Sequence, residues 1–136
     1  MGGIHRFSNF EIIVLAAMFC VVALIDAPQV IKAGDEAKLA ELIESLELVR
    51  SRLDVYRSEH EWSLPPCDSF ETFEAALTRN EGNGNPYIER IPENPFNKLQ
   101  RVRFDGAPAG TGLAGWRLDT KTGDFQADHD PSYTEL

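Results

Sequence analysis

The chain has 136 residues, which is enough for one domain and little more. Its 22 acidic and 13 basic residues give a net charge of −9, and the acidic excess lies after residue 33. This balance argues against a nucleic-acid partner, because phosphate binding needs a clustered basic face. A solvated acidic surface is expected instead.

The apolar residues concentrate in one run, residues 12–25, which allows three interpretations. A cleaved secretory signal would need small residues before its cleavage site, whereas Ile25 and Pro28 flank the candidate site after Ala27. A buried helix of a soluble domain would need a surface that hides it all round, and the rest of the chain is short and polar. A membrane anchor fits best, because residues 7–25 are long enough for a hydrocarbon core of ~30 Å.

The anchor contains one acid, Glu11. An ionised carboxylate inside the bilayer costs on the order of 2 kcal/mol or more, so a binding partner is expected for it. An intramembrane acid of this kind predicts a functional site.

Residues 7–29, FSNFEIIVLAAMFCVVALIDAPQ, resemble the N-terminus of type IV pilins and type II secretion pseudopilins. Mature chains of that family begin with Phe, followed by Glu four residues later, an apolar run, and Pro twenty-one residues after the Phe, often with Gln next. Phe7, Glu11, Pro28 and Gln29 keep this spacing.

The resemblance implies a structural filament subunit and no enzymatic activity. It implies that Phe7, Glu11 and Pro28 act in assembly, with the Glu paired to the free amine of a neighbouring subunit. Pro28, together with Gly34, also indicates a kink or a loosened turn in the helix. Implied partners are copies of this chain or related pilin-like subunits, together with the prepilin peptidase and secretion machinery. The expected location is the inner membrane, crossed once, with the head outside the cytoplasm because His5 and Arg6 mark the cytoplasmic side.

The leader, residues 1–6, departs from the family pattern. Family leaders end in Gly, whereas Arg6 precedes Phe7 here and the glycines stand at positions 2 and 3. Arg6–Phe7 is the candidate processing junction. If the leader is retained, Phe7 has no free amine, and Arg6 or His5 of a neighbour would face Glu11.

Four segments follow from these patterns: the leader, the membrane and assembly segment 7–30, an amphipathic helical segment 31–64, and a head, 65–136. A helix continuous from Phe7 to about Trp62 would be ~80 Å long. Pro65-Pro66 ends it. Apolar residues recur at three- and four-residue steps and predict one buried face: Leu39, Leu42, Ile43, Leu46, Val49, Leu53 and Tyr56.

The head is predicted to contain a short helix over 69–79, opened by a capping box from Asp68 to Glu71. Alternation of Val102 and Phe104 with Arg101, Arg103 and Asp105 predicts a strand with one solvated face. A hairpin with Gly123 at its turn follows. The fold class is therefore α+β, with the long helix packed against a small antiparallel sheet of about three strands.

No catalytic motif is present in the sequence, and no cofactor is predicted apart from a calcium alternative. Asp124, Asp128 and Asp130 supply oxygen ligands of the kind that calcium prefers, and major pseudopilins bind calcium in a C-terminal loop. The competing interpretation is an acidic frayed terminus. A metal site near His60 is disfavoured, because successive helical positions point in different directions.

The principal functional hypothesis is thus a subunit of a membrane-anchored pilin-like filament or secretion pseudopilus. The alternative is a single-pass anchored binding module that stays outside any filament.

Overall fold

The computed structural model describes the backbone of residues 9–80 and 84–136, and the side chains of residues 34–80 and 84–136. The chain divides into two compact units, Met1–Ala37 and Lys38–Leu136. Among the residues whose side chains are described, no helix is long and apolar enough to cross a membrane. The predicted anchor, residues 7–30, lies outside that part, and the predicted segment boundaries stay predictions.

The long helix α1 runs over Asn9–Glu59. It ends slightly before the predicted Trp62, because the chain turns into the left-handed region at Glu61 and Trp62, with φ of 53° and 64°. The Trp62 amide donates to the Arg57 carbonyl at 2.7 Å and closes this turn ahead of Pro65-Pro66. The kink predicted at Pro28 stays a prediction.

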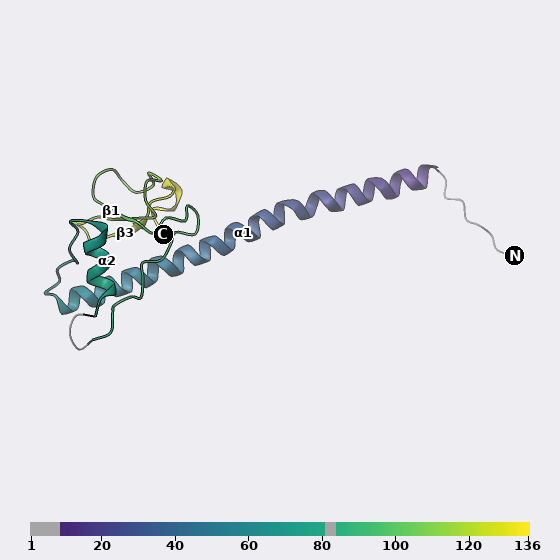
Figure 1. The fold of residues 1–136 in the computed structure, drawn as a ribbon. Helices are drawn as coiled ribbons and strands as arrows, with labels where there is room; N and C mark the ends of the chain where they lie inside the picture. The colour runs from purple at the N-terminus through teal and green to yellow at the C-terminus, as the bar shows by residue number, and fades with distance from the viewer. Residues whose placement is uncertain (1–8, 81–83) are drawn as a thin grey trace. The chain divides into compact units, whose positions relative to one another are not determined.

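The second unit forms around the C-terminal part of α1, with α2 (Phe70–Thr78) and the strands gathered against it (Figure 1). The predicted buried face of α1 is confirmed except at Ile43, which is 37% exposed, and at Leu39, which is only partly buried. The buried positions follow a four-three-four-three spacing that leaves Ile43 one position off the stripe. They are Leu42, Leu46, Val49, Leu53 and Tyr56.

Helix α2 confirms the predicted short helix, but its cap differs from the prediction. Ser69, and not Asp68, is the N-cap, and it exchanges hydrogen bonds with Thr72. The hydroxyl of Thr72 takes the role predicted for the carboxylate of Glu71. With this start, α2 turns Phe73 and Leu77 into the core, where both are fully buried.

The α+β fold class is confirmed, and the sheet is mixed where an antiparallel sheet was predicted. Strands β1 (Val102–Phe104), β2 (Trp116–Leu118) and β3 (Phe125–Ala127) lie in the order β1-β2-β3. The β2–β3 hairpin is antiparallel as predicted, with Gly123 at φ 82°. β1 pairs with β2 in parallel, because the loop 105–115 carries the chain back to the start of β1 before β2 begins.

One face of the sheet packs on the helices through Trp116 and Phe125, whose ring centroids are 5.4 Å apart. The indole N–H of Trp116 donates to the Pro92 carbonyl at 2.8 Å, so this buried donor is satisfied. The opposite face carries polar side chains in register, and it too is covered, since Arg117 is only 8% exposed.

Replacing Leu46 by Ala should destabilise the full-length chain in detergent by about 2–5 kcal/mol, because the change leaves a cavity at a side chain that is 1% exposed. The matched control is Leu48→Ala on the same helix, where the side chain is 40% exposed and the expected change is within about 0.5 kcal/mol. Denaturant unfolding measures both. Equal losses for the two variants would contradict this assignment of the buried face.

Candidate functional site: the Arg103–Asp128 cluster

The residues predicted for assembly and processing fall where side chains are not described. Arg6 and Phe7 lie outside the described residues altogether. Glu11 and Pro28 belong to α1, but only their backbone is described. Their functional roles therefore stay predictions, and the candidate site that can be built atom by atom lies in the head.

That site is an ion pair between strand β1 and the residue that follows strand β3. Nη2 of Arg103 lies 2.8 Å from Oδ1 of Asp128, and Nε lies 3.1 Å from Oδ2. The two bonds form the two-pronged arrangement in which guanidinium and carboxylate match best. The Asp128 side chain is fully buried and that of Arg103 is 19% exposed. The prediction that the Arg103 side chain lies on a solvated face was therefore wrong.

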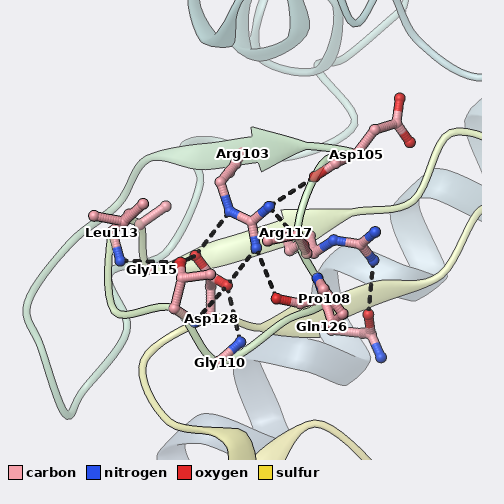
Figure 2. Close-up of polar contacts among 12 residues, drawn as sticks. Arg103, Asp105, Pro108, Gly110, Leu113, Gly115, Arg117, Gln126 and Asp128 are labelled. Atoms are coloured by element: carbon pink, nitrogen blue, oxygen red, sulfur yellow. Dashed lines mark hydrogen bonds and ion pairs between the residues drawn. The ribbon is translucent and has the colours of Figure 1, made fainter.

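The remaining Arg103 donors bind the main chain of the loop 105–115 (Figure 2). Nη1 donates to the carbonyls of Asp105 and Ala107, at 2.7 and 2.8 Å. Nη2 also donates to the Pro108 carbonyl at 3.2 Å. A guanidinium has five N–H donors, and all of them are used here. Arg103 thus binds three carbonyl oxygens of one loop and the carboxylate of Asp128, the residue that follows β3.

Asp128 holds the second half of the same loop (Figure 2). Oδ1 accepts from the amides of Gly110 and Thr111 at 2.9 and 3.2 Å, and Oδ2 accepts from the Thr111 hydroxyl at 2.8 Å. Its main-chain carbonyl accepts from the Gly112 amide at 2.6 Å. The loop is therefore held in both of its halves by one charge pair.

The exit of the loop is held by a buried amide that sequence reasoning did not select. Asn94 is fully buried and donates to the Gly115 carbonyl at 2.9 Å, while Asn97 donates to the Ala114 carbonyl at 2.9 Å. A Cβ at Gly115 would overlap the Leu99 carbonyl oxygen, so only Gly allows this approach. The turn at Asn94-Pro95-Phe96 thus holds the end of the loop, with Phe96 partly buried against the core.

Electrostatics keep the central pair charged. Burial alone raises the pKa of Asp128, but hydrogen bonds from Arg103, Thr111 and Gly110 outweigh burial and lower this pKa below its ordinary value of 3.8. The hydrogen bond to Asp128 raises the pKa of Arg103. Arg117 lies beside Arg103 in register and binds Gln126 and Asp119, at 3.2 and 3.4 Å, so the neighbouring cation has its own partners.

The predicted frayed terminus is wrong for the tail around these residues. Asp128 is buried, and Asp130 caps a 3₁₀ turn, η1 (Pro131–Tyr133), by accepting from the Ser132 amide at 2.8 Å. His129 stacks on Phe96 with centroids 4.5 Å apart, and burial lowers its pKa. Sequence reasoning treated these residues as a loose acidic end because the partners of Asp128 and His129 lie 17 to 35 residues away in the chain.

A comparison with known proteins adds one relative that extends over almost the whole chain. The chain is similar to a type II secretion system core protein. This relative, core protein G of Pseudomonas aeruginosa, is 23% identical over 131 residues, which cover 91% of this chain and 90% of that protein. No family model matches the chain, and no solved structure matches it. The similarity supports the pseudopilin resemblance of residues 7–29 and extends it to the head.

The residues at Asp128 do not fit the calcium ion that the resemblance implies. Both carboxylate oxygens are engaged by five hydrogen bonds, and the cation that faces them is the Arg103 guanidinium. Asp124 is exposed. Across the described parts of the chain, no group of three or more His, Cys, Asp or Glu side chains is placed to hold a metal ion, and this includes the surroundings of His60. Calcium binding by Asp124 or Asp130 stays a prediction.

Asp128→Asn should destabilise the full-length chain at pH 7 by about 3–5 kcal/mol, because it breaks a buried pair and leaves Arg103 uncompensated. A lowered folded pKa contributes stability above the unfolded value and loses it as pH falls through the folded value. The difference between Asp128→Asn and the unchanged chain should therefore shrink below about pH 4, as followed by denaturant unfolding across pH.

The control is the same substitution at the exposed Asp124, which should change the free energy of unfolding by less than about 0.5 kcal/mol at either pH. A stability gap for Asp128→Asn that stays constant from pH 7 to pH 2 would contradict the charged state assigned to this carboxylate.

Proposed function

We propose that this protein is a structural, non-enzymatic subunit of a membrane-anchored pilin-like filament, in particular a type II secretion pseudopilus. The observation that carries the proposal is similarity over nine-tenths of both chains to a type II secretion system core protein. The spacing of Phe7, Glu11 and Pro28 supports it independently, since these positions match the family pattern.

The described structure is compatible with such a role. One helix, α1, continues from the predicted assembly segment into the core of the head, where its stripe organises α2 and the sheet. A subunit built in this way would be held by its N-terminal helix in the inner membrane and would expose an acidic head outside the cytoplasm. Neighbouring copies or related subunits would then stack by a head-to-tail interface that does not close.

Assembly depends on Glu11 in this proposal. A carboxylate inside an apolar helix is costly unless it is paired, and in a filament the partner would be a cation of a neighbouring subunit. In the processed protein that cation is the amine of Phe7; with the leader retained it is Arg6 or His5. The non-polymerising alternative has no specific observation of the described residues in its favour.

Glu11→Leu should abolish filament assembly while leaving membrane insertion intact, because the leucine removes the charge that needs a neighbour and improves the apolar run. Electron microscopy of detergent-released material measures assembly, and membrane fractionation measures insertion. Glu36→Ala, an exposed position on the same helix, is the control and should assemble as the unchanged chain does. Unaltered filaments from Glu11→Leu would overturn the proposal.

N-terminal sequencing of the membrane-extracted protein identifies the cation that pairs with Glu11. A first residue of Phe7 is expected for a processed subunit and assigns the pairing to the new amine. A start at Met1 or Gly2 would rule out processing at Arg6–Phe7 and assign the pairing to the leader.

A further inference from the structure

The loop 105–115 is organised around a single positive charge. The carbonyls of Asp105 and Pro108 and the carboxylate of Asp128 point toward the Arg103 guanidinium (Figure 2). The Ala107 carbonyl also accepts from this guanidinium. Main-chain carbonyls combined with a buried carboxylate form the kind of oxygen shell that proteins build around hard cations. Here the cation is a side chain of the protein itself.

We propose that Arg103 is a tethered cation that organises this loop in place of a bound metal ion, so that the head folds independently of divalent cations. The proposal concerns the head alone, so its failure would leave the proposed filament function untouched.

The geometry of the guanidinium explains how one side chain can bind four groups of the protein at once. Its five donors lie in a plane and reach oxygens on both sides of the loop, whereas the ammonium group of a lysine has three donors at a single point. Because Asp128 is fully buried, its negative charge has to be balanced by a cation within hydrogen-bond distance. Gly110 adds a further constraint, because it has φ 101° and a Cβ there would lie 2.6 Å from Pro131.

A divalent ion is excluded from this place as long as Arg103 occupies it. The ion would have to approach a guanidinium that already neutralises the carboxylate, and the like charges repel. Removing the guanidinium removes this repulsion. A buried carboxylate and three carbonyls are then left without a cation. Gly110 and Thr111 still donate to the carboxylate, but its negative charge is no longer balanced, so an added cation can be bound there.

The test measures thermal unfolding of the full-length chain in detergent, with excess EDTA and with millimolar Ca²⁺. The unchanged chain should melt at the same temperature in both. Arg103→Ala should melt lower in EDTA by on the order of 10 °C, and Ca²⁺ should restore part of this loss. Arg101→Ala is the matched control on the neighbouring residue, because that side chain is 67% exposed and its ion pair with Glu71 spans 3.9 Å. It should shift little in either condition.

Three outcomes would overturn the proposal. One is a melting temperature of the unchanged chain that rises with Ca²⁺ or falls with EDTA. Another is an Arg103→Ala variant that melts as Arg101→Ala does. The last is a destabilised Arg103→Ala variant that Ca²⁺ leaves unchanged, since Arg103 would then be an ordinary ion-pair partner of Asp128. Should Arg103→Ala fail to fold in EDTA, Arg103→Lys replaces it. Arg103→Lys keeps the charge, and its melting temperature should be measurable but lower than those of the unchanged chain and Arg101→Ala.

Discussion

The head depends on the compensation of one buried charge. Asp128 follows the last strand and is fully removed from water, so its carboxylate has to find donors within the protein. It finds them in Arg103 on β1 and in the main chain of a loop that would otherwise lack order. The same pair joins the two outer strands of the sheet across β2. A loss of either partner therefore affects the loop and the strand order together.

This constraint explains how a three-stranded sheet of three-residue strands is held together. Strands of this length bury little area by themselves. One face gains its stability from the apolar stripe of α1, with Trp116 and Phe125 packed against it. The other face is closed by the loop 105–115, which Arg103 and Asn94 hold from its two ends. The sheet thus has a covered face on each side, one apolar and one polar.

The Arg103–Asp128 pair also affects how a pilin-like head could keep the conformation of its loop 105–115. Similarity to a secretion core protein and the pattern around Glu11 support a filament subunit, in which each head meets neighbours repeatedly. A loop whose cation belongs to the chain keeps its conformation regardless of the divalent ions in the surrounding solution. The loop then becomes ordered when the subunit folds, and its order does not depend on binding a ligand.

Local sequence patterns determined the elements: the stripe of α1, the short helix α2 and the β2–β3 hairpin follow from apolar spacing, a capping box and turn residues. Only the tertiary structure decided that β1 runs parallel to β2, that Ile43 faces solvent, and that Arg103 binds Asp128. The alternation of apolar and polar residues predicted correctly that Arg103 faces away from the apolar core. It could not predict that a loop covers this second face of the sheet. The reason is physical: periodicity reports which side of an element a residue occupies, whereas its partner is set by chain segments 25 residues away.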